Sequence, residues 1–154
     1  MLLINKIIKK LIKNNVSVST AESCTGGLLS SKITSIPGVS KIFNMGLITY
    51  SNKSKNIILN ISLSSIKRNG AVSEEIAILM SKNLSKISKS NLCISTTGIA
   101  GPSGGTIKKP VGLAYISITY FDKNYVFKKK FKGKRSKIQK DAIDFCFNKL
   151  KKLI

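Results

Sequence analysis

Short runs rich in β-branched residues alternate with stretches of helical periodicity along this chain, and this alternation limits its fold more than any other feature. The predicted strands are residues 16–20, 43–50, 92–97, 111–121 and 125–131. The predicted helices are residues 3–12, 28–36, 51–59, 61–68, 73–88 and 136–152. Strands that alternate with helices predict an α/β fold, and the last two strands, which form a hairpin, make its sheet mixed. The length of 154 residues fits a single domain, residues 1–154.

The composition excludes several kinds of catalytic site. The sequence contains no histidine, so a Ser-His-Asp triad, a Cys-His pair and a His-ligated metal are all excluded. The three cysteines, Cys24, Cys93 and Cys146, are widely spaced and form no CxxC motif, so we expect neither a zinc site nor a disulfide framework. Unpaired cysteines favour a reducing compartment, and a cytoplasmic location is expected.

The net charge of +21, from 27 basic and 6 acidic residues, suggests an anionic partner. Arginine, which makes most bidentate contacts to nucleic acid, occurs only at Arg68 and Arg135, so the other 25 of the 27 basic residues are lysines. Isoleucine and asparagine are also abundant, and A/T-rich codons produce this combination without selection for binding. We therefore expect no specific nucleic-acid partner, and a basic nucleic-acid binder is an alternative hypothesis.

The apolar positions in residues 3–12 have helical spacing, which predicts a helix that packs on the sheet. Lysines interrupt this stretch, which argues against a signal peptide. No segment approaches the ~18 consecutive apolar residues of a membrane span, so no membrane partner is expected. A helix that lies on a membrane surface is the alternative interpretation of this segment.

The segment AESCTGG, residues 21–27, lies between a predicted strand and a predicted helix. Free N–H groups at such a turn, together with the N-terminus of the helix, predict a site for an anion or an oxyanion. Ser23, Cys24 and Thr25 place three potential nucleophiles in this segment. A capped turn without chemistry is the alternative interpretation.

A second loop, GIAGPSGG at residues 98–105, also follows a predicted strand. It is not a Walker A loop, because no Gly-Lys-Ser/Thr closes it, and it does not match GxGxxG. Ligands of open α/β sheets bind at the carboxyl ends of the strands, so we expect both loops to line one crevice. A flexible connection is the alternative interpretation of this loop.

Without histidine, the base for a hydroxyl nucleophile must be Lys, Asp, Glu or Tyr. Glu22 is the only acid near either loop, whereas lysines are abundant. A neutral lysine can act as a base if its pKa falls from about 10.4 to about 7–8, a change of roughly 4 kcal/mol. The spacing of the residues does not identify which lysine this is.

Four segments stand in the order and spacing of one known family. They are AESCTGG at residues 21–27, ITYSNKSK at residues 48–55, GAVSEE at residues 70–75 and TGIAGPSGGTIKKPVG at residues 97–112. Together they closely resemble the CinA C-terminal domain family, the nicotinamide-nucleotide amidases, over nearly the whole chain. The resemblance implies a three-layer α/β/α sandwich with a mixed, mostly parallel sheet. It also implies hydrolysis of nicotinamide mononucleotide to nicotinic acid mononucleotide and ammonia in pyridine nucleotide salvage, with no metal or organic cofactor.

The resemblance also implies roles for individual residues. Ser23 would be the nucleophile and Lys55 its base, whereas Lys53 is at a position that the family leaves variable. Cys24 is the alternative nucleophile, because thiols are intrinsically more reactive. The expected substrate-binding residues are Thr25, Gly26, Gly27, Tyr50, Thr97, Gly98, Ala100, Gly101, Gly104, Gly105, Lys109 and Arg135. Among these, Lys109 and Arg135 are the expected phosphate partners.

The chain departs from the family in two respects. Members often have an additional N-terminal domain, whereas here Met1 begins directly at the amidase domain, so only amidase activity is expected. Near Arg135 the family often has a preceding acid and a second arginine, where this chain has Lys134 and Gln139. Residues 70–73 are interpreted as a structural turn and helix cap. We expect a homo-oligomer, with a dimer favoured, and a non-catalytic nucleotide-binding module of the same fold is the alternative function.

Overall fold

The computed structural model describes residues 2–154, which fold into three layers around a mixed five-stranded sheet of order β2-β1-β3-β4-β5. The strands are β1 (Val18–Glu22), β2 (Phe43–Ile48), β3 (Leu92–Gly98), β4 (Leu113–Tyr120) and β5 (Lys123–Lys130). The helices are α1 (Leu2–Lys13), α2 (Leu28–Thr34), α3 (Asn52–Leu59), α4 (Leu63–Asn69), α5 (Glu74–Ser88) and α6 (Arg135–Leu153), with a 3₁₀ turn η1 at Val39–Lys41. The predicted α/β/α sandwich is confirmed.

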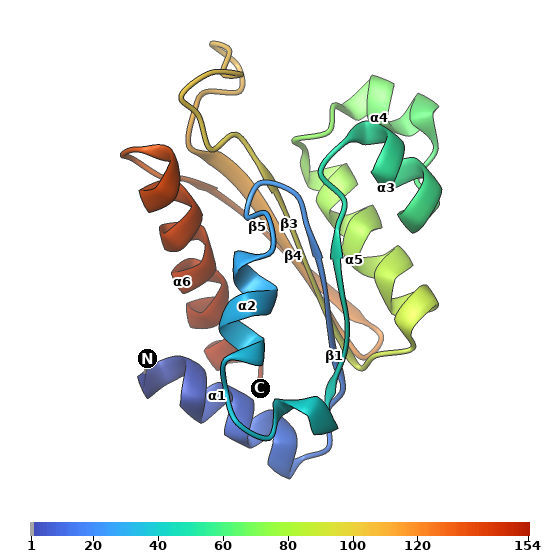
Figure 1. The fold of residues 1–154 in the computed structure, drawn as a ribbon. Coiled ribbons are helices and arrows are strands. Elements are labelled where there is room, and N and C mark those ends of the chain that lie inside the picture. Colours follow the sequence, from blue (N-terminus) through green and yellow to red (C-terminus); the bar gives the residue numbers. More distant parts are fainter. Residues whose placement is uncertain (1) are drawn as a thin grey trace.

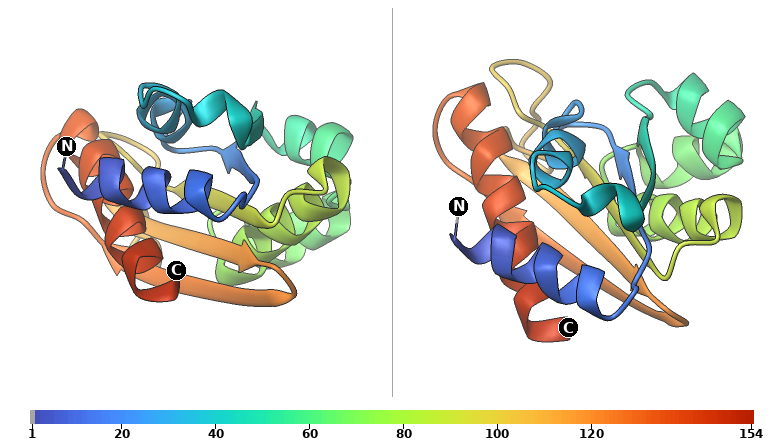
Figure 2. Two further views of the ribbon diagram at one scale, coloured as in Figure 1. Left: turned by 90° about the horizontal axis from the view of Figure 1, so that it is seen from below. Right: turned by 60° about the horizontal axis from the view of Figure 1, so that its bottom comes forward.

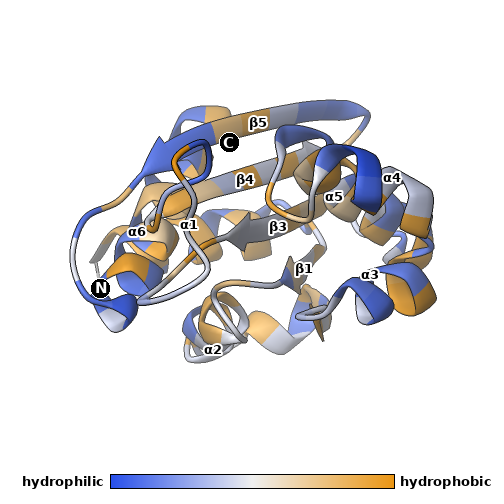
Figure 3. Ribbon diagram, turned by 90° about the horizontal axis from the view of Figure 1, so that it is seen from above, coloured by the Kyte–Doolittle hydropathy of each residue, from blue (hydrophilic) through white to orange (hydrophobic). Residues whose placement is uncertain are grey.

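Helices cover both faces of the sheet. Helices α1, α2 and α6 lie on one face, and α5, with α3 and α4 beside it, lies on the other (Figure 1). The larger apolar core joins the first group to the strands through residues such as Leu29, Ile94 and Phe147. The core under α5 is smaller and includes Ile76 and Met80. Hydrophobic residues also run along β4, which lies between β3 and β5 in the sheet (Figure 3).

The strand directions explain why the sheet is mixed. Strand β1 is parallel to both β2 and β3, whereas β4 is antiparallel to β3 and to β5. Within residues 2–154, four strands therefore point in one direction and β4 points in the other. Helical crossovers connect the parallel strands, and a tight hairpin connects β4 to β5, as the sequence predicts.

Strand β1 extends two residues beyond its predicted end at residue 20. Ala21 is paired with Leu47 of β2 and Ser95 of β3, and Glu22 continues the same two ladders. Because β1 is hydrogen-bonded on both sides, the pairing carries the strand past its β-branched run. As a result, Ser23 follows directly on the end of a central strand.

Helix α1 packs its apolar face on the core and lies against α6 (Figure 2). Its buried residues are Ile4, Ile7, Ile8 and Leu11. This arrangement confirms the predicted helix that packs on the sheet layer. No helix in the described part of the chain is both long and apolar enough to cross a membrane.

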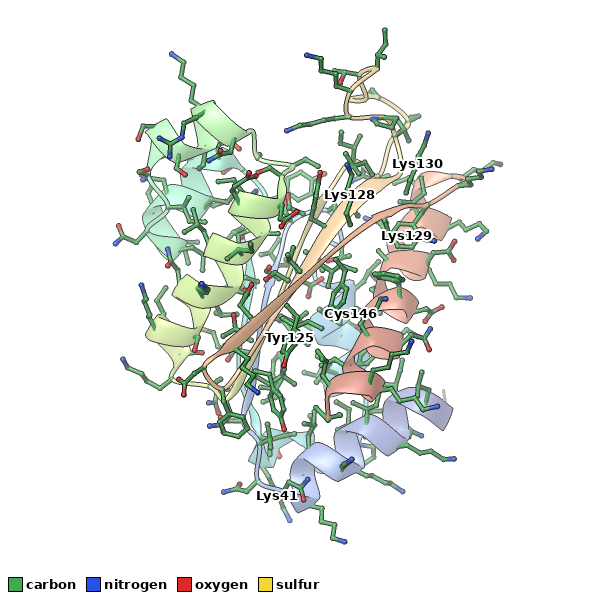
Figure 4. The ribbon with its side chains drawn as sticks, turned by 180° about the vertical axis from the view of Figure 1, so that it is seen from behind. Lys41, Tyr125, Lys128, Lys129, Lys130 and Cys146 are labelled. Carbon is green, nitrogen blue, oxygen red and sulfur yellow. The ribbon has the colours of Figure 1, made fainter. Side chains whose placement is uncertain are left out.

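The positive charge lies mainly on the surface. Lys128, Lys129 and Lys130 extend from the edge strand β5 and are exposed (Figure 4). Lys55 is the exception, because it alone among the lysines that the structure describes is buried, with 1% of its surface accessible. A buried amine is costly unless it is neutral or hydrogen-bonded, so this residue indicates a functional site.

Candidate active site

Loops from separate parts of the chain meet at the carboxyl ends of β1, β2 and β3. Ser23 follows β1, Tyr50 lies just after β2, and the glycine-rich loop follows β3. With the start of α6 and the segment before α5, they enclose a cavity of about 320 Å³. Its lining residues are Ser23, Cys24, Tyr50, Lys55, Ala71, Val72, Thr97, Gly98, Ile99, Ala100, Gly101, Ser103, Gly104 and Arg135. Both loops predicted from the sequence therefore contribute to one cavity.

Ser23 and Lys55 lie together at the base of this cavity. The Nζ atom of Lys55 is 3.1 Å from the Oγ atom of Ser23. It also donates to the backbone oxygen of Thr49 at 2.9 Å and lies 3.5 Å from that of Tyr50. The distance between Nζ and Oγ is within the range that direct proton transfer requires.

The start of α3 carries Lys55 into the cavity. Ser51 caps this helix by accepting from the Ser54 amide, and the Ser54 hydroxyl in turn accepts from the Ser51 amide. Such a reciprocal capping box fixes the first helical turn. Lys55 lies one residue later and is thereby held with its side chain toward Ser23.

Burial changes the acid–base properties of Lys55. Loss of hydration disfavours the charged ammonium, so burial lowers the pKa of Lys55 below its usual value of 10.5. No carboxylate of the described residues forms a salt bridge with it that would reverse this effect. Lys55 therefore fits the lysine base of lowered pKa that a hydroxyl nucleophile can use in a protein without histidine.

Glu22 occupies the anion-binding position at the N-terminus of α2. Its fully buried carboxylate accepts from the backbone amides of Gly27, Leu29 and Ser30 and from the hydroxyls of Thr25 and Ser30. Free amides and the positive end of the helix dipole stabilise an anion at this position. The sequence predicts that a ligand binds there, but the site is filled by the protein's own carboxylate.

Two backbone amides in the turn after β1 donate to no protein oxygen atom of the described residues. From Ser23 to Ser30, all amides but two already donate to protein oxygen atoms; those that do are Ser23, Gly26, Gly27, Leu28, Leu29 and Ser30. Within the described residues, the amides of Cys24 and Thr25 have no such acceptor. Cys24 lines the cavity, whereas Thr25 is fully buried and does not, so an oxyanion at Ser23 would be held by the Cys24 amide.

Cys24 is a poor candidate for the nucleophile. Burial, with a smaller contribution from the nearby Glu22 carboxylate, raises the pKa of its thiol to about 12. The reactive form of a cysteine is the thiolate, which is scarce at neutral pH when the pKa is this high. The structure thus favours the hydroxyl of Ser23 over the thiol beside it.

Arg135 connects two sides of the cavity. Its guanidinium donates to the hydroxyl of Tyr50 at 2.8 Å and to the backbone oxygen of Gly101 at 2.9 Å. Tyr50 is exposed, so this contact lies near solvent rather than in the core. These two contacts bring together two loops and the start of α6, which are far apart in the sequence.

The end of β3 and the loop after it contribute most of the residues predicted there to the cavity, but not all. Thr97, Gly98, Ala100, Gly101 and Gly104 line it, whereas Gly105 does not. A Cβ atom at residue 98 would lie 2.7 Å from the backbone oxygen of Leu113, so this position requires glycine. Gly105 instead packs against Val111: a Cβ atom added at residue 105 would lie 2.7 Å from the backbone nitrogen of Val111.

Four further predicted binding residues lie outside the cavity lining. Thr25 is fully buried and donates to Glu22 and contacts Thr96, and Gly26 and Gly27 form the turn that leads into α2. The Nζ atom of Lys109 donates to the backbone oxygen of Asn69 at 3.0 Å, so it secures the end of α4. These positions follow mainly from hydrogen bonds between segments that are distant in the chain, which sequence spacing does not reveal.

Sequence reasoning missed residues that contact or support the cavity. Ala71 and Val72 line it, although their segment was predicted to be only a turn and helix cap. Gln139 of α6 donates from Nε2 to the backbone oxygen of Cys24 at 2.9 Å. Two signals pointed to Gln139: it stands where the family often has a second arginine, and its spacing of four residues from Arg135 places both side chains on one face of a helix.

Cysteine and acidic residues do not gather into a metal site. Among residues 2–154, no group of three or more His, Cys, Asp or Glu side chains is placed to hold a metal ion. The thiols of Cys24, Cys93 and Cys146 are all free and buried.

Comparison with known proteins identifies relatives over the full length of the chain. The family model of the CinA C-terminal domain matches residues 2–154. A protein of Caldanaerobacter subterraneus subsp. tengcongensis named competence-damage inducible protein is 45% identical over 148 residues, which are 96% of this chain and 36% of that protein. A protein of the same name from Thermoanaerobacter pseudethanolicus is 48% identical over 133 residues, 86% of this chain and 32% of that protein. The chain thus spans about a third of the length of these curated relatives.

Solved structures show the same fold. A competence-damaged protein (CinA) superfamily protein from Escherichia coli superposes with a TM-score of 0.94 at 30% identity, covering 99% of this chain and 88% of the other. The competence/damage inducible protein CihA from Agrobacterium tumefaciens superposes with a TM-score of 0.91 at 30% identity, covering 98% and 95%. Both likenesses extend over all three layers.

Proposed function

Since the chain belongs to the CinA C-terminal domain family, we propose that it is a nicotinamide-nucleotide amidohydrolase that uses Ser23 as nucleophile and Lys55 as base. The substrate of this proposal is nicotinamide mononucleotide, and the products are nicotinic acid mononucleotide and ammonia. The observation that carries the proposal is the contact between the buried Lys55 amine and the Ser23 hydroxyl.

The surroundings of Lys55 support a neutral amine whose lone pair faces Ser23. A neutral amine has two N–H donors and one lone pair. The backbone oxygens of Thr49 and Tyr50 can only accept, so they take the two N–H groups. Of the three contacting groups, only the Ser23 hydroxyl can donate to the lone pair. These contacts support the orientation in which Lys55 removes a proton from the nucleophile.

The proposed acylation step follows from this orientation. Lys55 takes the hydroxyl proton as the Oγ atom of Ser23 attacks the carboxamide carbon. The negative charge moves to the carboxamide oxygen, which the amide of Cys24 is available to bind; one such donor typically contributes about 2.7–4 kcal/mol. The ammonium of Lys55 gives a proton to the amide nitrogen as the carbon–nitrogen bond breaks, and this nitrogen leaves as ammonia.

Deacylation repeats the same proton transfers with water. Lys55 takes a proton from a water molecule, whose oxygen attacks the acyl carbon. The bond to Ser23 breaks, the carboxylic acid product leaves, and the proton on Lys55 returns to the Oγ atom. The cycle restores the starting protonation of both residues.

Ammonia release from nicotinamide mononucleotide tests the proposal. The purified protein should release ammonia, and Ser23→Ala should reduce kcat at least 10³-fold because the nucleophile is lost. Ser40→Ala is a matched control, since Ser40 is exposed in η1, away from the cavity. Full activity of Ser23→Ala would refute the assignment, and saturable binding without turnover by the wild type would identify a non-catalytic nucleotide-binding module.

A further inference from the structure

One face of α6 holds the loops around the cavity in place. Arg135 and Gln139 are four residues apart and so lie on the same side of the helix. Arg135 contacts Tyr50 and Gly101, and Gln139 donates to the backbone oxygen of Cys24 at 2.9 Å. Arg135 lines the cavity, whereas Gln139 does not and reaches it only through Cys24. Gln139 is therefore placed to act on the backbone rather than on a bound molecule.

The backbone of Cys24 is fixed from both sides. The peptide before it is held because the Ser23 oxygen accepts from the Gly26 amide at 3.1 Å. The peptide after it is held because the Cys24 oxygen accepts from Gln139. In a planar trans peptide the N–H points away from the C=O, so the bond from Gly26 sets the direction of the Cys24 amide and the bond from Gln139 sets that of the Thr25 amide. These are the two amides left without a protein oxygen acceptor in this turn of the described chain.

We propose that Gln139 is a positioning residue for the oxyanion site: by holding the Cys24 oxygen it keeps the Cys24 backbone, and with it the free Cys24 amide beside Ser23, in place. This inference rests on the proposed function, because an oxyanion forms only if Ser23 attacks a carbonyl group. The side-chain amide is required as a donor. A carboxylate of the same shape would face the Cys24 oxygen with a second acceptor and push it away.

Gln139→Glu tests the inference, because it replaces the donor by an acceptor of the same size. We expect kcat for nicotinamide mononucleotide to fall about 10- to 100-fold with little change in KM, since a misplaced donor costs transition-state binding. Gln139→Arg, which retains N–H donors, should recover most of kcat. Lys140→Gln is the matched control, because it also lowers the net charge by one and lies on the exposed side of the same helix.

A structural measurement accompanies the kinetics. NMR order parameters of the Cys24 and Thr25 amides should fall in Gln139→Glu from the ~0.85 of rigid backbone toward the ~0.6 of flexible backbone, and should stay high in Lys140→Gln. If the wild type is active and Gln139→Glu matches it in kcat and in these order parameters, the inference is wrong and the proposed function stands. If the wild type releases no ammonia, the proposed function fails and the catalytic role of Gln139 fails with it.

Discussion

The Nζ atom of Lys55 lies 3.1 Å from the Oγ atom of Ser23, although 32 residues separate them in the sequence. Each residue reaches this contact through a different constraint. Ser23 follows a strand that is paired on both sides, and Lys55 lies in the first turns of a capped helix. The pair is therefore held by secondary structure on both sides, which is the arrangement that a preorganised site requires.

Replacing the base should abolish most of the activity. Lys55→Met keeps the length of the side chain but has no group that accepts a proton, so we expect kcat to fall about 10²- to 10⁴-fold. Lys53→Met is the matched control, because Lys53 lies in the same helix and is exposed. Equal losses in the two variants of ammonia release would contradict the assignment of Lys55.

The activity should also depend on pH through Lys55. Because burial lowers the pKa of Lys55, kcat/KM should rise with pH as the amine loses its proton and reach a plateau below pH 10.5. The unfolded chain binds this proton up to 10.5 and the folded protein releases it earlier, so the free energy of unfolding should rise with pH across this interval. Lys55→Met should lack that rise in urea titrations; an unchanged pH dependence would show that another group is responsible.

Removing the charge of Glu22 should destabilise the fold. Five hydrogen bonds end on this buried carboxylate, and Glu22→Gln would place an N–H group against some of the donors. We expect the free energy of unfolding to fall by about 2–4 kcal/mol, measured by urea denaturation. Glu74→Gln, which changes an exposed acid in the first turn of α5, should cost only about 0.3–1 kcal/mol. Similar losses in both variants would mean that the Glu22 network adds little.

The thiol of Cys24 should be dispensable for catalysis. With a pKa of about 12, it should react slowly with a thiol reagent such as DTNB at pH 8 in the native protein, whereas all 3 cysteines should react after unfolding. Cys24→Ala retains the backbone amide and should keep kcat within about fivefold, because only the side chain is changed. A loss as large as that of Ser23→Ala would instead identify Cys24 as the nucleophile.

Arg135 and Tyr50 should be coupled in substrate binding. If Arg135 binds the substrate phosphate, Arg135→Gln should raise KM for nicotinamide mononucleotide about tenfold and have little effect with nicotinamide riboside, which lacks the phosphate. Since Arg135 also donates to the Tyr50 hydroxyl, Tyr50→Phe should raise KM less in the Arg135→Gln background. The expected coupling is about 0.5–1.5 kcal/mol. Additive effects on KM would show that the contact has no role in binding.

The sequence by itself determined the layered fold. The alternation of strand and helix periods predicts an α/β sandwich, and the final hairpin predicts the mixed sheet, because these patterns depend on local propensity and on which face is buried. The two loops that line the cavity could also be predicted, since loops after parallel strands meet at one edge of a sheet. Ser23 and Lys55 followed only when four motifs were matched to a family together.

Only the tertiary structure decided which donors and acceptors meet. Glu22 was recognised as an acid near the first loop, but its carboxylate fills the helix N-terminus that had been expected to bind a ligand. Lys109 and Gln139 likewise bond to the backbone oxygens of Asn69 and Cys24, which are distant in sequence. The physical reason is that a backbone amide or carbonyl is the same chemical group at every position. The sequence therefore contains little information on which of them remain free until the chain has folded.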